Sequence, residues 1–559
     1  MRIFRDSATL LIRSKILLTF MILLFGFVVW EVGSLYGKTK FAATMPLRNA
    51  LTLSIYLFIM MMFLSYEYAR KLFHNGASEA MLATTAGRKR KNYKMVFCMM
   101  SIYSGIMSLL VGVIVINEYL YYKISDPNRE YVIHIIKNIF LNDFLIMELG
   151  IVAGIALAAI RKRMSAYAVM CFLSIAISPY ASSMAYMIDL SDVRHTGAGR
   201  AAFKFLSYFY LMPGIMSKAM PREEAGESVL PYRFFIIGFW LFLFLSFICL
   251  TRTRYKKYAV ASIILCLALF TAYTYPASRM EQTMDIYLNG VPDQIYVLES
   301  RDFIAKEEPA DYKILEYDLN LSIKANLSVT ADMKVSKSLE RYRMTLYRQY
   351  KVSEAVDQDG HKLEYTQNQD YLDVWNKGRY HITNIIVKYK GSSSSGYANY
   401  QGCYLPGYYP YYPRAGYIDL YDKELGYIKP YFVDKDTYFR VKVNPGKYIS
   451  NLPEKHGIYQ GRCDGFTLVS GFYKIKKFEN GNKLVYPYLN EFVIHDRKKS
   501  EKECWQETFD FVEESLQKDG IKNSIIFSDN KILTGNIKKA YGEKQIFVTS
   551  GGVFYYSDS

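Results

Sequence analysis

Two carboxylates, Asp143 and Glu148, stand in an apolar stretch of the sequence that is long enough to enter a membrane. A carboxylate in hydrocarbon is costly, so Glu148 is expected to face protein or water. It could line a translocation path, or it could be a protonated, hydrogen-bonded structural residue. The residue types alone leave both interpretations open.

Small residues follow these acids at four-residue spacing, at Gly150, Gly154 and Ala158. Residues four apart lie on one face of an α-helix. Small side chains on such a face let two helices approach closely within a membrane. The pattern therefore predicts a packing face, either for another span of the same chain or for a second subunit.

Signatures of nucleotide or zinc chemistry are missing from the sequence. No G-x-x-x-x-G-K-[ST] occurs, so the chain lacks a phosphate-binding loop of that kind. None of the seven histidines is followed by a second histidine four residues later, the spacing that places two zinc ligands on one helix face. Cys403, Cys463 and Cys504 permit at most one disulfide in the second half, and no C-x-x-C occurs. We expect no metal and no cofactor bound by this chain.

The apolar runs of residues 1–275 predict a polytopic α-helical membrane domain. A crossing needs about 20 apolar residues, and only a helix satisfies its own backbone groups in lipid. We predict six to seven spans, with candidates at 16–32, 51–66, 95–117, 144–160, 166–190, 234–250 and 258–274. The first is interpreted as an anchor rather than a signal peptide, because no clear small-x-small cleavage site follows it.

Basic residues gather in alternate connections between these spans, at 88–94, 161–163 and 252–257. Short loops rich in Lys and Arg stay in the cytoplasm, so the N-terminus is predicted to be cytoplasmic and the chain after residue 274 extracytoplasmic. The same clusters account for much of the net charge of +17. We therefore expect a multi-pass protein of the cell membrane, with lipid and not nucleic acid as a partner.

The second half changes from long apolar runs to alternation of apolar and polar residues. Segments 317–323 and 327–335 alternate throughout, which is typical of strands with one buried face. Asp359-Gly360 predicts a hairpin turn between strands at 352–356 and 363–365. We predict a transmembrane domain at 1–275, a linker at 276–310, an extracytoplasmic β-sandwich at 311–498 and a short α/β tail at 499–559. The tail contains a helix at 499–517.

The segment at 404–417, YLPGYYPYYPRAGY, is rich in tyrosine and proline. Its rings could form an aromatic binding surface. The alternative, which we favour, is an ordered loop whose rings cover the edge of a sheet.

The first half resembles the permease subunits of type-two ABC transporters. Residues 1–15 read as a basic amphipathic helix along the inner leaflet, and 203–214 is apolar but too short to cross. Between the second and third spans runs a loop with Glu67, Arg70, Gly76, Glu79 and Arg88, a pattern that looks like the family's ATPase-coupling loop. The resemblance implies an ABC ATPase subunit as partner, which alone would use ATP, and a second permease copy or a related permease. The alternative is a basic loop that only fixes topology.

The second half resembles the N-terminal β-sandwich of the aminopeptidase N family of zinc peptidases. The similarity lies in YDLNLSI at 317–323, VKYKG at 387–391 and YLPGYYPYYP at 404–413. The family's G-x-M-E-N strand and H-E-x-x-H helix do not follow, so the tail looks like the start of a truncated catalytic domain. The resemblance therefore implies a non-catalytic peptidase-like module, and we expect no enzyme activity.

Together these features favour a membrane permease subunit of an ABC-type exporter, with an outward β-rich accessory domain. The alternative is a membrane-anchored receptor or sensor with a peptidase-like ectodomain. Seven spans are more than anchoring requires, which favours the permease.

Overall fold

The computed structural model describes residues 14–33, 45–74, 92–122, 129–160, 162–178, 205, 208–211, 232–250, 256–280, 306–393, 396–400, 402–422, 427–487, 501–528 and 538–549. The chain divides into two compact units. One, here the membrane unit, comprises Met1–Pro221 and Glu227–Leu288, and the other, the β unit, comprises Arg222–Gly226 and Asn289–Ser559. The division at 288/289 falls inside the predicted linker.

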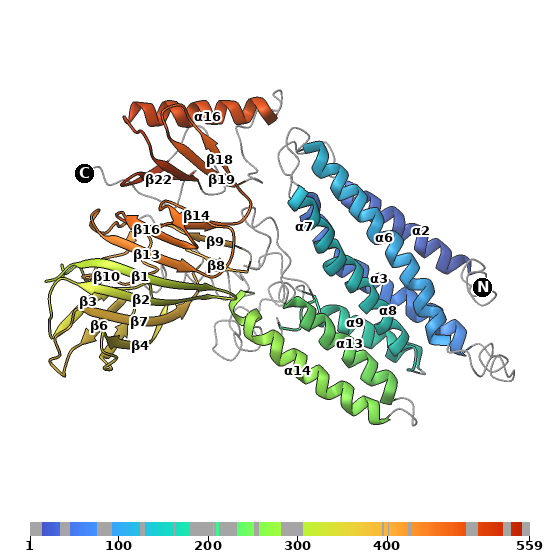
Figure 1. Ribbon diagram of the computed structural model, residues 1–559. Helices are drawn as coiled ribbons and strands as arrows, with labels where there is room; N and C mark the ends of the chain where they lie inside the picture. The colour runs from blue at the N-terminus through green and yellow to red at the C-terminus, as the bar shows by residue number, and fades with distance from the viewer. Residues whose placement is uncertain are drawn as a thin grey trace. The chain divides into compact units, whose positions relative to one another are not determined.

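The membrane unit is helical in its described parts (Figure 1). Its helices are α2 (Lys15–Gly33), α3 (Met45–His74), α6 (Asn92–Tyr122), α7 (Arg129–Ile139), the π-helical turn η1 (Phe140–Phe144), α8 (Leu145–Leu157), α9 (Arg163–Ala176), α13 (Arg233–Leu250) and α14 (Lys256–Met280). A helix lies at each of the seven predicted positions.

Four helical stretches in the described part of the chain are long and apolar enough to cross a membrane: Val96–Leu120, Arg129–Leu157, Arg233–Leu250 and Lys257–Ala277. Their outward side chains are large and apolar, as at Leu109, which is 71% exposed, and Ile264, which is 63% exposed. Such surface is unfavourable in water and suits lipid. The composition of these helices indicates a membrane protein.

The fourth and fifth predicted spans differ from the helices observed. The fourth was expected to begin at residue 144, but the helical stretch runs from Arg129 through η1 to Leu157. Polar residues such as His134 and Asn138 interrupt the hydropathy of its first half and hid that half from the sequence pattern. The fifth, expected over 166–190, is described as helix only over Arg163–Ala176, and residues 179–190 lie outside the described part.

The β unit contains sheets over one shared hydrophobic core. A seven-stranded sheet has the order β15-β16-β13-β1-β2-β7-β4, and two four-stranded sheets have the orders β10-β3-β6-β5 and β14-β17-β9-β8. The strands are β1 (Ile314–Ile323), β2 (Leu327–Val335), β3 (Arg341–Thr345), β4 (Lys351–Asp357), β5 (Glu364–Asn368), β6 (Tyr371–Trp375), β7 (Asn384–Gly391), β8 (Ala398–Asn399), β9 (Gly402–Leu405), β10 (Arg414–Ala415), β13 (Tyr438–Val443), β14 (Ile449–Ser450), β15 (Glu454–Lys455), β16 (Ile458–Arg462) and β17 (Leu468–Ser470), besides the small pair β11 (Tyr421–Asp422) and β12 (Tyr427–Ile428).

The predicted alternation is confirmed at the centre of the large sheet. β1 pairs antiparallel with β2 and parallel with β13. Tyr317, Leu319 and Leu321 of β1 are buried in the core, as are Tyr342 and Met344 of β3 in the neighbouring sheet. Residues two apart share one face of a strand, so this register turns the whole apolar face of β1 inward.

The turn at Asp359-Gly360 is present, but the strands beside it separate into different sheets. Gly360 has φ +86°, a left-handed conformation that glycine adopts readily. Beyond the bridge between Val356 and Lys362, β4 joins β7 whereas β5 joins β6. The expected simple hairpin is therefore a crossing point between two sheets.

The C-terminal tail is a five-stranded sheet with one covering helix (Figure 1). Its order is β18-β19-β20-β22-β21, from β18 (Tyr473–Lys477), β19 (Lys483–Pro487), β20 (Ile525–Ser528), β21 (Lys538–Gly542) and β22 (Gln545–Thr549). α16 (Glu501–Lys518) packs Val512 and Leu516 against Leu484 and Ile526 of this sheet. The sequence prediction placed 473–487 with the sandwich, but pairing between β19 and β20 assigns those strands to the tail.

Candidate functional site

The entry to the predicted coupling loop is held by side chains of α9. Glu67 accepts hydrogen bonds from the Arg163 guanidinium, at 3.1 Å, and from the Tyr167 hydroxyl. Arg70, one turn further along α3, donates to the Tyr66 hydroxyl at 2.8 Å. The connection after the second predicted span is thereby tied to the one after the fourth.

The remaining loop residues named from the sequence, Gly76, Glu79 and Arg88, lie outside the described residues. The amphipathic segment expected over residues 1–15 is also outside, except for residues 14 and 15. The structure therefore describes the start of the loop pattern and not its centre.

Glu148 lies between α8 and α6 and is hydrogen-bonded. The Ser101 hydroxyl donates to its carboxylate at 2.6 Å, and the Ser104 hydroxyl also donates to it. The two serines are three residues apart and share one face of α6. The sequence hypothesis named Glu148 without naming these donors.

The small-residue face of α8 lies against α3. A Cβ built on Gly154 would meet the Ser65 Oγ at 2.0 Å and the Met62 carbonyl at 2.3 Å. A Cβ built on Gly150 would meet the Phe58 carbonyl at 2.6 Å. Ala158, the last of the three small residues, is buried at the end of α8. Of the partners left open by the sequence, this face lies against another helix of the same chain.

A short segment around Phe209 packs on α13 and α14. The Trp240 indole donates to the Phe209 carbonyl at 3.0 Å, and the Phe209 ring stacks on Phe270 with ring centroids 5.1 Å apart. The Leu211 N–H donates to the Ile177 carbonyl at 3.0 Å. The described part of the short apolar segment at 203–214 is thus anchored against these two helices and the end of α9.

The tyrosine-rich segment is interior. Tyr408, Tyr409, Tyr411 and Tyr412 are all at most 4% exposed. Arg414, fully buried, donates to the carbonyls of Gly407, Tyr408, Tyr409 and Tyr431. The segment is therefore an ordered loop, but its rings pack into the core instead of covering the edge of a sheet or forming a binding surface.

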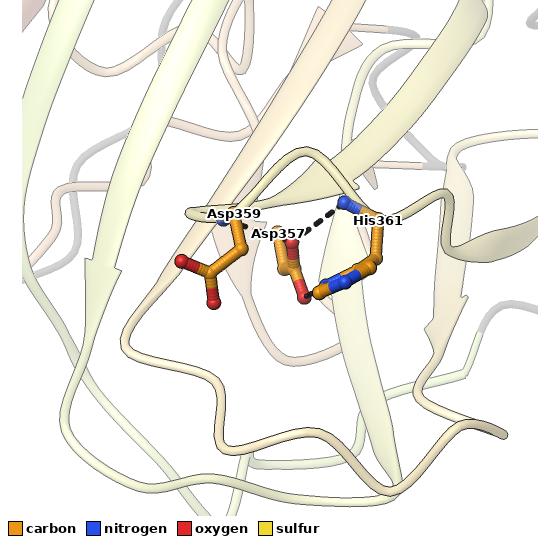
Figure 2. Close-up of side chains that lie close together, drawn as sticks. All are labelled: Asp357, Asp359 and His361. Carbon is orange, nitrogen blue, oxygen red and sulfur yellow. Dashed lines mark hydrogen bonds and ion pairs between the residues drawn. The ribbon is translucent and has the colours of Figure 1, made fainter.

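One group in the described part of the chain has the donor types and proximity of a metal site, at Asp357, Asp359 and His361 (Figure 2). The buried Asp357 carboxylate already accepts hydrogen bonds from the backbone N–H groups of Asp359 and His361, at 3.0 and 2.8 Å. Its second oxygen lies 2.9 Å from Nδ1 of His361, whose ring stacks on Tyr380. These contacts close the turn between β4 and β5, so its own geometry accounts for the group.

Burial alone would raise the pKa of the Asp357 carboxyl. The hydrogen bonds from the His361 ring and from the N–H groups of His361 and Asp359 outweigh burial, and they hold the pKa below its usual value. The carboxylate form is therefore the one that stabilises the turn.

Two buried thiols of the β unit are unsuited to chemistry. Cys403 and Cys463 are free, and burial raises the pKa of each to about 12. The nucleophile is the thiolate, which is scarce at neutral pH when the pKa is this high. Cys504, the third cysteine of this half, lies where its side chain is outside the described residues.

A row of buried polar residues on α6, α7 and η1 was not predicted from the sequence. Glu118 is fully buried, and Asn138 and Asn142 are at most 8% exposed. Asn142 donates to the Asn138 Oδ1 at 3.3 Å. The four-residue spacing of His134, Asn138 and Asn142 was a visible signal, but the helix was expected to begin only at residue 144.

No protein-family model and no curated protein matches the chain. Among solved structures, it is similar to the M1 zinc metallopeptidase from Deinococcus radiodurans, with 11% identity, a TM-score of 0.28, and coverage of 43% of this chain and 62% of that one. It is also similar to leukotriene A4 hydrolase from Saccharomyces cerevisiae, with 12% identity, a TM-score of 0.30, and coverage of 45% and 44%. The chain thus spans less than two thirds of either protein, and similarity of this size carries no information on activity.

Proposed function

We propose that the chain is the membrane permease subunit of an ABC-type exporter, driven by a separate ATPase, with the β unit as an outward accessory domain. The proposal starts from the order of elements in the first half, which resembles type-two permeases. ATP-driven movement of the partner would act on residues 67–94 and switch paired permeases between inward- and outward-open states.

The contact of Glu67 with Arg163 carries the proposal. Glu67 opens the loop pattern after the second predicted span, and Arg163 closes the basic link after the fourth. Their 3.1 Å ion pair supports placing both connections on one side of the membrane. This is the cytoplasmic side under the positive-inside rule, where an ATPase would bind.

The accessory role is assigned to the second half. Within the β unit, the tail sheet packs on the sandwich through a buried network. Gln545 donates to Asp464 at 2.6 Å and to the Gly465 carbonyl at 2.8 Å. A module built in this way could receive or bind cargo outside the membrane.

Co-purification of the partner tests the coupling assignment. The full chain is co-expressed with the ABC ATPase encoded nearest to it, and ATPase retained on the tagged chain is measured for wild type and for Arg88→Glu. We expect reversal of charge in the loop to reduce retention at least tenfold. Arg254→Glu is the matched control, since it reverses a charge in another basic connection on the same proposed side.

Equal retention by wild type and Arg88→Glu would contradict the coupling role and favour the receptor alternative. Loss of retention in both variants would also contradict it, because the effect would then be general to basic loops. Protease added to intact cells tests the topology separately, and we expect digestion of the β unit from outside.

A further inference from the structure

The interface between α6 and the helix α7–η1–α8 holds polar groups along most of its length. At one end the rings of Tyr119 and Tyr131 lie with centroids 4.9 Å apart. At the other end Ser101 and Ser104 bond to Glu148. With about 1.5 Å of rise per helical residue, the two contacts are about 25 Å apart along the axis, close to the thickness of a bilayer core.

Asp143 lies five residues before Glu148 on this helix, in η1, which contacts both α6 and α3. A Cβ on Gly112 of α6 would lie 3.8 Å from Ile139, which fixes the antiparallel register between the two end contacts. In this register Ser108 of α6 is level with Asp143. The Asp143 side chain is fully buried, and neither of its oxygens has a hydrogen-bond partner among the described residues. The Ser108 Oγ is likewise buried without one.

The backbone around Asp143 is a π-helical turn. The Leu145 N–H donates to the Phe140 carbonyl, five residues back, instead of to the carbonyl four residues back. Single π turns inside α-helices are frequent at functional sites. Asn142 and Asp143, in succession within this turn, are buried at 8% and 0% exposure.

Among the described side chains of the elements packed on η1, no opposite charge lies near Asp143. η1 contacts α3 and α6. The α3 residues level with Asp143 include the buried Leu53, Ser54 and Ile55, and the nearest titratable group of α3, Tyr56, is 39% exposed.

On α6 the nearest titratable groups are Glu118, which is another acid, and Tyr103, which donates to the Met21 carbonyl. The titratable groups near Asp143 on its own helix are His134, Lys137 and Glu148, and Lys137 is exposed. No described cation therefore faces the Asp143 carboxyl.

A buried carboxylate with neither a donor nor a cation is strongly disfavoured. A hard cation such as Ca²⁺ gathers about six or more oxygen ligands, whereas a proton needs one carboxyl oxygen. Glu118 repeats the arrangement, because it is fully buried and neither of its oxygens has a hydrogen-bond partner in the described part of the chain.

We propose that Asp143 is a proton-binding site in the membrane unit, and that Glu118 and Glu148 are the neighbouring proton acceptors along the same helix interface. Asn138 and Asn142 bridge part of the distance between Glu118 and Asp143. The site is independent of the ATPase proposal, since it requires only the packing of α6 on α7–η1–α8. Chains of acids within membrane helices serve as proton relays in pumps and transporters.

Infrared spectroscopy of the full chain in lipid nanodiscs tests the site. A protonated carboxyl has its own C=O stretching band, which shifts in D₂O. We expect such a band at neutral pH, its loss on raising the pH, and a decrease by the area of one carboxyl in Asp143→Asn. Asp311→Asn is the matched control, because that side chain is 75% exposed in the β unit, and we expect its band to equal wild type.

Labelling wild-type protein with ¹³C-aspartate provides a measurement that needs no variant to fold. In helices α2 to α14, as far as they are described, Asp143 is the only aspartate. A pH-sensitive band that shifts with the label and persists after proteolytic removal of the β unit from the nanodisc supports the site.

Three results would overturn the proposal. The first is a band unchanged in Asp143→Asn. The second is a labelled band that does not respond to pH, since Asp143 would then be a fixed structural acid. The third is a band that disappears when Na⁺ or K⁺ is added at constant ionic strength, since the carboxylate would then hold a metal cation.

Discussion

Buried ionisable side chains are accommodated in opposite ways in the two units. In the β unit, the Arg414 guanidinium donates to four backbone carbonyls and lies 4.9 Å from the centre of the Tyr412 ring, and only its Nε has no partner among the described residues. In the membrane unit, neither oxygen of the Asp143 carboxyl has a described partner.

The difference distinguishes a buried group that stabilises the fold from one whose burial the fold does not explain. Arg414 organises the loop at 404–417, because its donors satisfy carbonyls that would otherwise be buried without a bond. The Asp143 carboxyl makes no hydrogen bond to the described residues, so its burial does not stabilise the fold through such bonds. An unpartnered polar group of that kind, within a membrane helix, points to a binding role instead.

Removing Arg414 is the largest expected perturbation. Arg414→Met leaves the carbonyls of Gly407, Tyr408, Tyr409 and Tyr431 without their donor, and we expect a loss of about 3 kcal/mol or more in the stability of the β unit. Pulse proteolysis of the full chain in urea, read from a C-terminal tag, measures it. Arg440→Met is the control, since its pair with Asp318 is exposed and should be worth less than about 1 kcal/mol. Equal effects would remove the contrast with Asp143.

Enlarging Gly154 tests the packing that positions the polar row. Gly154→Ala places a Cβ against Ser65 and the Met62 carbonyl, and we expect about 1–3 kcal/mol of destabilisation. Gly105→Ala on α6 meets nothing within 4 Å and should be neutral or slightly stabilising. Thermal unfolding in detergent compares the two variants. If Gly105→Ala were the more harmful, α3 and α8 would not pack as described.

Asp357, like Arg414, is a buried ionisable residue of the β unit with hydrogen-bond partners, and its carboxyl titrates at acidic pH. Its pKa is lowered on folding, so its contribution is present above the usual pKa and is lost as the pH falls through the lowered value. We expect Asp357→Asn to cost about 1 kcal/mol at neutral pH, with the difference from wild type shrinking as the pH falls below the usual carboxyl pKa. Melting curves across this range measure it. A difference that grew on acidification would reverse the assigned sign.

The smallest expected change in stability is at Asp143. If its carboxyl already holds a proton, Asp143→Asn exchanges one neutral group for another of similar size, and we expect less than about 1 kcal/mol at neutral pH. The measurement is the same detergent melt used for Gly154. Destabilisation equal to that of Arg414→Met would indicate an ionised, partnered carboxylate and would end the comparison from which the proton site was argued.

The sequence predicted the strands well because their burial alternates cleanly. β2 was expected at 327–335 and is observed over those residues, since its apolar residues alternate without interruption and fit one buried face. The assignment of β4 and β5 to different sheets was not predictable. The turn between them fixes the direction of each strand but not the strand with which each one pairs.

The candidate site could be predicted only in part. Glu148, Gly150 and Gly154 stood out as an acid and small residues in an apolar run. Glu118 did not, because it lies one residue beyond the span predicted at 95–117. The helix α7 did not, because polar residues lowered its local hydropathy. The π turn has no sequence signature, since it depends on which carbonyl the Leu145 N–H selects.

The turn η1 also makes this helix tolerant of a one-residue deletion. A π turn stores one residue more than the helix needs, while the flanking turns keep their phase. Deleting one residue within 140–144 would let the hydrogen-bond ladder close regularly, with α7 still facing α6 and α8 still facing α3. If the deleted residue is Asp143, the buried acid is lost while the packing of the helix is retained.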